Sequence, residues 1–427
     1  MSSPQLKVLV VGASIAGPTA AYWLAKAGAH VTVIERFPAL RAGGQAVDIR
    51  TAGVTVMRKM PGMEAAVRSK FTQLEGISFV RENVNSRPYG TIRATGNPDQ
   101  QSLVSEYEIF RGDLAHILFD MTRDNENIKY VFGEQVTSIL TPENDKKDSD
   151  GPVTVEFANG FPTSEYDLVV ACDGATSRTR ALGLGCGVRD HIIPINCWAS
   201  FFSIQQDLVE GSKVGQGYSA PGGRFVALGL DPSGATRATL MAIYPRDGML
   251  PFREAMKQGD DALKQFVAEH YKSAGWKTDE AIKGLLGESR DFYANEIVQV
   301  KPPCIYKGRF AMVGDAGYAP GPTGGGTTLA ITGAYVLAGE INKHRGNLAA
   351  GLRGYEETMR PLINEMQKIP PLVLLAMAPQ TVWGIWVRNH VFAFIAWTRI
   401  LEFAQKYFAG AFASTEKYPL PDYEWMA

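Results

Sequence analysis

The chain has 427 residues, 45% hydrophobic and 20% charged, which is long enough for two interleaved domains. Its 43 basic and 44 acidic residues leave a net charge of −1, which argues against a nucleic-acid-binding protein or a polybasic membrane anchor. The four cysteines form no CxxC pair and no His/Cys cluster, so we expect reduced thiols, no metal site and a cytoplasmic location. Only a few polar residues precede the first predicted strand, so we expect no signal peptide.

Residues 6–36 predict a strand, a glycine-bearing turn, a helix and a second strand. The β-branched run 7–11 is typical of a strand buried on both faces, and the helix should extend from about Ala16 to Ala27. Glu35 ends the second strand 18 positions after Gly17, where dinucleotide folds place a carboxylate near a ribose hydroxyl. The turn between them reads Gly12-Ala13-Ser14-Ile15-Ala16-Gly17, with Ser14 in place of the middle glycine. The alternative is an ordinary strand–helix–strand crossover, but the combined pattern favours a pyrophosphate at the helix N-terminus.

The middle of the chain changes from buried parallel-type strands to alternating ones. Residues 41–50 contain paired glycines, including Gly44, and predict either a ligand-facing loop or a plain turn. A helix should begin near Gly112, and the apolar strand 166–171 leads directly into Asp173-Gly174. From about residue 184 to 300 the alternation predicts antiparallel strands and one helix. We expect this region to form a substrate domain whose candidate pocket residues are Trp198, Phe202, Phe225, Met241 and Tyr244, although aromatic residues on strands also serve as plain core.

A further buried-type strand, residues 308–313, precedes a second glycine-rich region. Gly314 and Asp315 follow it, and then a loop that contains Pro322, Gly324, Gly325 and Gly326. Consecutive glycines before a helix are entropically costly, and a plausible use is to expose backbone N–H groups to a ligand oxygen. A flexible connector is the alternative.

Together these motifs resemble the class A flavoprotein monooxygenases, the family of para-hydroxybenzoate hydroxylase, and are closest to its tetracycline-inactivating members. Three features match, in the same order, over about residues 6–360. They are the first turn, a complete DGxxSxxR sequence at Asp173, Gly174, Ser177 and Arg180, and the Gly314-Asp315 motif with its loop. Two positions depart from the family pattern, which often has His and Asn where this chain has Tyr318 and Thr328.

The resemblance implies a set of cofactor-binding roles. Glu35, followed by Arg36, would hold the adenosine ribose of FAD, Arg111 would lie along the pyrophosphate, and Asp315 would bind near the ribityl chain. Asp173 belongs to the motif linked to both FAD and the nicotinamide nucleotide, and Asp48 matches a flavin-side aspartate. The amides of Gly324, Gly325 and Gly326 would face the flavin ring. The implied cofactor set is non-covalent FAD, NAD(P)H as a transient reductant, and O2.

The implied fold class is α/β, with a Rossmann-like FAD-binding domain, an inserted mixed-sheet substrate domain and a C-terminal helical segment. The expected boundaries are 1–75, 105–185 and 295–365 for the first, 76–104 and 186–294 for the second, and 366–427 for the third. The apolar tail is interrupted by Pro379, Gln380 and Arg388, so we expect one or two helices packed on the flavin domain, without membrane contact. A monomer or a dimer would fit, with a small-molecule substrate and no nucleic acid.

The implied function is hydroxylation or epoxidation of a mostly apolar, aromatic or polycyclic small molecule, of the kind found in secondary metabolism, through a flavin C4a-hydroperoxide. No side chain is identifiable as a catalytic acid or base. The alternative is a flavin-dependent dehydrogenase or oxidase on the same fold. A flavin halogenase is disfavoured because Trp383-Gly384-Ile385-Trp386-Val387 is not the WxWxIP element, and a non-catalytic flavoprotein has little support.

Overall fold

The computed structural model describes residues 5–41, 43–72, 74–82, 87–94, 107–141, 151–231, 234–287, 289, 291–370, 373–398 and 419–425. The structure has two parts, each built on one large sheet and each made from several segments of the chain. The first part, called the first half below, is built on a six-stranded sheet in the order β17-β18-β11-β1-β2-β7. The strands are β1 (Lys7–Val11), β2 (His30–Glu35), β7 (Ile128–Phe132), β11 (Leu168–Ala171), β17 (Tyr306–Lys307) and β18 (Phe310–Met312). All pairs are parallel except β17–β18. The Rossmann-like prediction is confirmed.

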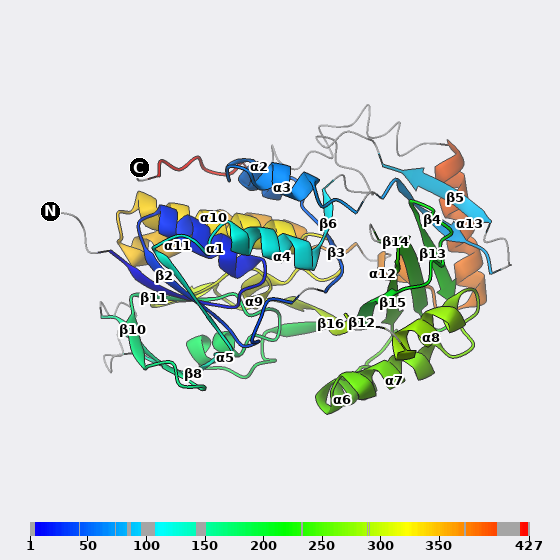
Figure 1. The fold of residues 1–427 in the computed structure, drawn as a ribbon, viewed down its shortest axis with the longest axis horizontal. Coiled ribbons are helices and arrows are strands. Elements are labelled where there is room, and N and C mark those ends of the chain that lie inside the picture. Colours follow the sequence, from blue (N-terminus) through cyan, green and yellow to red (C-terminus); the bar gives the residue numbers. More distant parts are fainter. Residues whose placement is uncertain are drawn as a thin grey trace.

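Helices and a small sheet cover the two faces of this six-stranded sheet (Figure 1). One face carries α1 (Ala16–Lys26), α4 (Arg111–Asp120), α10 (Gly326–Lys343) and α11 (Leu348–Met366), with α2 (Ala52–Arg58) and α3 (Met63–Arg68) beside them. The other face packs on β8 (Val136–Leu140), β9 (Val153–Phe157) and β10 (Ser164–Tyr166), near α5 (Arg178–Leu184). Two short elements complete this half, the β3 (Ala46–Asp48) and β6 (Glu108–Phe110) pair and the single-turn helix α9 (Asp315–Tyr318).

The second half is a seven-stranded sheet in the order β16-β12-β15-β14-β13-β4-β5. Its strands are β4 (Gly76–Val80), β5 (Pro88–Arg93), β12 (Ile192–Ile204), β13 (Val214–Ala220), β14 (Arg224–Leu230), β15 (Thr236–Ile243) and β16 (Tyr293–Val300). Helices α6 (Leu250–Gln258), α7 (Asp260–Tyr271) and α8 (Thr278–Gly287) pack on one face. The predicted antiparallel arrangement is present except for the parallel pair β4–β13. β16 crosses the domain boundary expected at residue 294.

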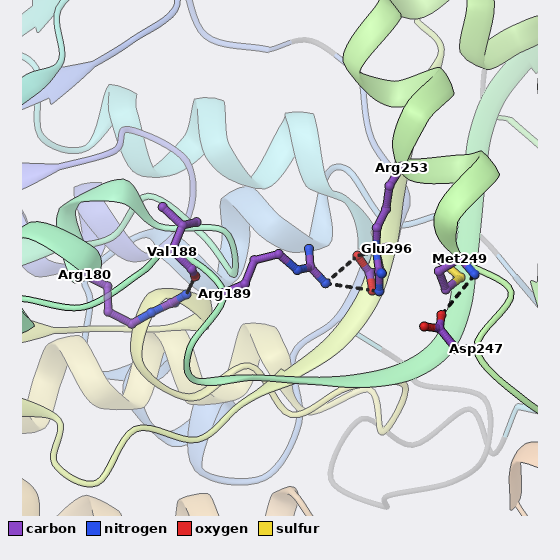
Figure 2. A network of polar contacts seen from close by, with 7 residues as sticks. All are labelled: Arg180, Val188, Arg189, Asp247, Met249, Arg253 and Glu296. Atoms are coloured by element: carbon purple, nitrogen blue, oxygen red, sulfur yellow. Dashed lines mark hydrogen bonds and ion pairs between the residues drawn. The ribbon is translucent and has the colours of Figure 1, made fainter.

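A buried carboxylate ties the two halves together (Figure 2). Glu296 on β16 is 5% exposed and pairs with Arg253 of α6 at 2.6 Å and with Arg189 at 3.1 Å. Arg189 follows Val188, whose carbonyl accepts a hydrogen bond from Arg180 of α5. A buried charge requires such partners, so Glu296 fixes the second sheet against the loop that follows α5.

The C-terminal part packs on both halves. It forms α12 (Val373–Met377) and α13 (Val382–Thr398), which confirms the helical prediction. Arg388 of α13 lies 3.8 Å from the Phe79 ring centroid and donates to Ser219 Oγ at 2.7 Å, so α13 packs on the second sheet. The expectation that the tail helices pack on the flavin domain is therefore wrong for α13, because the half-buried guanidinium of Arg388 contacts residues of β4 and β13. Residues 419–425 reach the first half instead, where Tyr423 donates to Glu340 at 2.8 Å. None of the helices in the described ranges is both long and apolar enough to span a bilayer.

Candidate functional site

The first glycine turn is held tightly against the end of β11. Gly12 has φ +108°, and a Cβ there would lie 2.7 Å from the carbonyl oxygen of Cys172. A Cβ at Gly17 would lie 1.8 Å from the oxygen of Gly12. Both positions therefore require glycine, and the turn delivers the chain directly into α1 at the carboxyl end of the parallel sheet.

The N-terminus of α1 is open toward the same edge of the sheet. Its N-cap residue, Ile15, makes no side-chain capping bond. The first backbone N–H groups of a helix have no partner within the helix, and together with the helix dipole they suit an anion. Ser14 Oγ accepts a hydrogen bond from Arg111 Nε at 3.3 Å, so a guanidinium stands beside these groups. Gly44 lies against the same arginine, since a Cβ there would be 3.1 Å from Arg111 Cβ.

Glu35 already uses part of its hydrogen-bonding capacity within the protein. Its carboxylate accepts from the Ala13 N–H at 3.0 Å and from the Phe37 N–H at 3.1 Å. A carboxylate has about four acceptor positions, so it can still accept bonds from a ligand. The neighbouring Arg36 is exposed, and its guanidinium lies 4.7 Å from the Phe37 ring centroid.

Gly314 brings the first and third motifs together. It has φ +68°, and a Cβ at this position would lie 3.1 Å from Ala16 Cβ of α1 and 3.3 Å from Ala330 Cβ of α10. The starts of two helices therefore meet at this glycine. Asp315 follows it, and burial raises the pKa of this carboxyl while the charge of Arg111 lowers it. The structure thus gathers Gly12, Ala16, Arg111, Gly314 and Asp315 into one site.

The three glycines of the loop face different neighbours. A Cβ at Gly324 would lie 3.9 Å from Asp48 Oδ2, and one at Gly326 would lie 3.5 Å from Asp315 Oδ1. A Cβ at Gly325 would instead lie 3.1 Å from Met366 Sδ of α11. Gly324 and Gly326 therefore border the carboxylates of the site, whereas Gly325, which follows Pro322 by three positions, is turned toward α11.

Thr328 explains one departure from the family pattern. Its Oγ1 accepts from the Arg50 N–H at 3.0 Å and donates to the Arg50 carbonyl at 3.1 Å. This reciprocal contact fixes the segment after β3 to the first turn of α10. The other departure, Tyr318, is directed into the core, where its hydroxyl lies 2.9 Å from that of Tyr355.

The DGxxSxxR motif is satisfied mainly within itself. Asp173 accepts from Ser177 Oγ at 2.5 Å and from Thr179 Oγ1 at 2.9 Å, and burial raises its pKa while these bonds lower it. Gly174 has φ +85°. Arg180 is fully buried and donates to the carbonyls of Val188 and Ala316, both at 2.8 Å. Because Ala316 follows Asp315, Arg180 links this motif to the Gly314-Asp315 motif.

The five candidate pocket residues do not share one face of the second sheet. Trp198 and Phe202 are fully buried beneath the helices, where Trp198 stacks on Phe252 and its Nε1 donates to Tyr244 at 3.1 Å. Phe225 and Met241 lie in a separate apolar cluster with residues of α12. Trp198 and Phe202 thus lie in the helix-covered core and Phe225 and Met241 in the other cluster, and the pocket role of the five residues stays a prediction. Alternation along a strand predicts two faces but does not say which of them packs on helices.

Sequence reasoning also missed two charged residues at the site. Arg50 pairs with Asp48 at 2.7 Å, and Glu108 lies directly opposite Asp48 in the β3–β6 pair. The sequence did indicate that Glu108 could lie near the site, because it precedes Arg111 by three residues. Its pairing with Asp48, however, depends on the tertiary fold.

Comparisons of this chain with known proteins identify the same family as the motifs do. The model of a family described as "FAD binding domain" matches residues 5–367. The chain is 33% identical to the FAD-dependent monooxygenase asL4 of Sarocladium schorii, covering 93% of this chain and 94% of that protein. The chain belongs to the class A FAD-dependent monooxygenase family.

Two further relatives extend over nearly the whole chain. Monooxygenase CTB7 of Cercospora beticola is 31% identical, covering 100% of this chain and 99% of that one. The crystal structure of tetracycline destructase Tet(51) has a TM-score of 0.77 at 26% identity and covers 98% of this chain and 100% of its own. The protein is thus a flavoprotein oxidoreductase of the monooxygenase type. Neither α1 nor α10 has a side-chain cap at its N-terminus, and these N-termini together with the adjacent Arg111 form a donor set that fits the pyrophosphate of FAD.

Proposed function

We propose that the protein holds one FAD non-covalently across the site and uses NAD(P)H and O2 to hydroxylate or epoxidise a mostly apolar, aromatic or polycyclic molecule. The observation that carries this proposal is the meeting of the α1 and α10 starts at Gly314, with Arg111 and Asp315 beside them. Bound FAD would supply the redox chemistry and the activation of oxygen.

In this proposal each motif has a defined task. The N–H groups at the start of α1 bind the pyrophosphate together with Arg111. Glu35 accepts a hydrogen bond from a ribose hydroxyl. Asp315 binds near the ribityl chain. Asp173 and Arg180 act by holding the end of β11 and the Ala316 carbonyl in place. Gly324 and Gly326 let the ring approach the backbone, while Gly325 is packed toward Met366.

An apolar cluster next to the glycine loop supports the substrate class. Ile195 belongs to this cluster, and its Cδ1 would lie 2.6 Å from a Cβ at Gly321. Phe225, Met241 and Met377 extend the cluster along the second sheet and α12. An apolar wall beside the ring would orient an apolar substrate and exclude water. Excluding water would limit the unproductive loss of activated oxygen as hydrogen peroxide.

The experiment is a measurement of oxygen consumption by the FAD-loaded protein with NADPH or NADH. A panel of phenols, polyketides and terpenoid indoles is screened for compounds that stimulate oxygen consumption. The products of reactions run under 18O2 are then analysed by mass spectrometry. We expect one member to stimulate consumption and to gain one labelled oxygen atom. Substrate oxidation without label, or with stoichiometric hydrogen peroxide, would instead favour a flavin-dependent dehydrogenase or oxidase.

A further inference from the structure

Two carboxylates face each other at the edge of the glycine loop. Asp48 on β3 and Glu108 on β6 are directly opposed in an antiparallel pair, so their side chains extend from the same face. Like charges directly opposed across a sheet are destabilising. Neither group is used by the proposed binding of the pyrophosphate or the ribose.

The two carboxylates have different partners among the described residues. Asp48 Oδ2 accepts hydrogen bonds from Arg50 Nε at 3.1 Å and from Arg50 Nη2 at 2.7 Å. Glu108 Oε2 accepts a hydrogen bond from the hydroxyl of Thr72 at 2.5 Å. A hydroxyl can both donate and accept, so it can bond to either form of the acid. The preceding residue, Tyr107, is directed away from this pair, toward Glu64 and Arg68.

The electrostatics of Glu108 agree with a retained proton. Burial raises the pKa of Glu108 to about 7, the Thr72 hydrogen bond lowers it, Asp48 raises it and Arg50 lowers it. The acid therefore changes charge near neutral pH.

The pair is mechanically connected to the proposed flavin site. Asp48 Oδ2 lies 3.9 Å from the Cβ position of Gly324, and the backbone after Asp48 is fixed to α10 by the reciprocal Arg50–Thr328 hydrogen bonds. Negative charge on a ligand at this loop would disfavour a second negative charge on the adjacent pair.

We propose that Glu108, directly opposed by Asp48, is a proton-binding site whose protonation is coupled to the redox state of the cofactor. This inference rests on the proposed function. Two-electron reduction of a bound flavin would add negative charge at this loop, and the carboxylate of Glu108 would then take one proton from solvent and become the acid. Reoxidation returns that proton to solvent.

The first test uses the ligand-free protein and the variant Glu108→Gln. Because the pKa of Glu108 is higher in the folded than in the unfolded chain, its contribution to stability is complete below about pH 4 and is lost as pH rises toward 7. Glutamine has no such loss. We expect the variant to melt at a higher temperature than the wild type at pH 8, with the difference nearly vanishing at pH 4. An equal difference at both pH values would contradict a retained proton.

A second variant checks the electrostatic influence of Asp48 on Glu108. Asp48→Asn removes the neighbouring negative charge, so the pKa of Glu108 should fall and the pH at which stability declines should move down with it. An unchanged transition would show that Glu108 titrates alone.

The deciding experiment measures the midpoint potential of the FAD-loaded protein between pH 5.5 and 8.5. One additional proton per two electrons adds about 30 mV per pH unit to the slope. We expect this additional slope near neutral pH in the wild type and in the control Asp113→Asn, whose carboxyl lies elsewhere, on α4, and its absence in Glu108→Gln. Parallel curves for all three proteins would overturn the coupling. FAD occupancy is measured in the same samples, so a protein that binds no FAD refutes the proposed function, whereas normal occupancy with parallel slopes refutes only this inference.

Discussion

Replacing Arg180 by methionine should lower the free energy of unfolding by about 3 kcal/mol or more. Arg180 is fully buried and donates to two carbonyls, those of Val188 and Ala316. Its loss leaves both acceptors without a donor and removes the positive charge near the buried Asp173. Urea unfolding followed by circular dichroism measures the change.

Arg178 provides the matched control, because it lies two positions away and is exposed. Arg178→Met should change stability by no more than about 0.5 kcal/mol. A similar loss in both variants would mean that the buried hydrogen bonds of Arg180 contribute nothing specific.

Replacing Asp315 by asparagine should weaken FAD binding by about 10- to 100-fold, the value of one charged hydrogen bond. The same change should raise the melting temperature of the ligand-free protein at neutral pH. Burial raises the pKa of Asp315, so the folded protein binds this proton more tightly than the unfolded chain, and stability is lost as pH rises through the folded pKa. Asparagine removes that loss.

Fluorescence titration with FAD and thermal melting of the same samples measure both effects of Asp315→Asn. Lower affinity together with higher stability is the expected result. If affinity and stability fall together, Asp315 is a structural residue and not a ligand-binding one.

The parts of the fold that follow from local pattern could be predicted from the sequence. The β1–α1–β2 unit, with Gly12, Gly17 and Glu35, was predictable because strand burial, helix start and turn chemistry all act within about 30 residues. The meeting of Asp173, Gly314 and the glycine loop followed from the family resemblance.

The parts that depend on packing between distant segments could not be predicted in this way. The alternation of β12 identified two faces, but only the positions of α6–α8 show that Trp198 lies in a core. Likewise, Asp48 and Glu108 are separated by 60 positions, and only the β3–β6 register brings them together. Arg388 looked like an interruption in an apolar tail, whereas its contact with Phe79 fixes α13 to the second sheet.

One FAD should bind where α1 and α10 begin. The most direct measurement is the flavin content of the purified protein, supplemented with FAD, passed over a desalting column and then precipitated with acid. We expect a yellow protein with one FAD per chain, all of it released into the supernatant. A colourless protein after supplementation, or colour that remains with the precipitate, would contradict it.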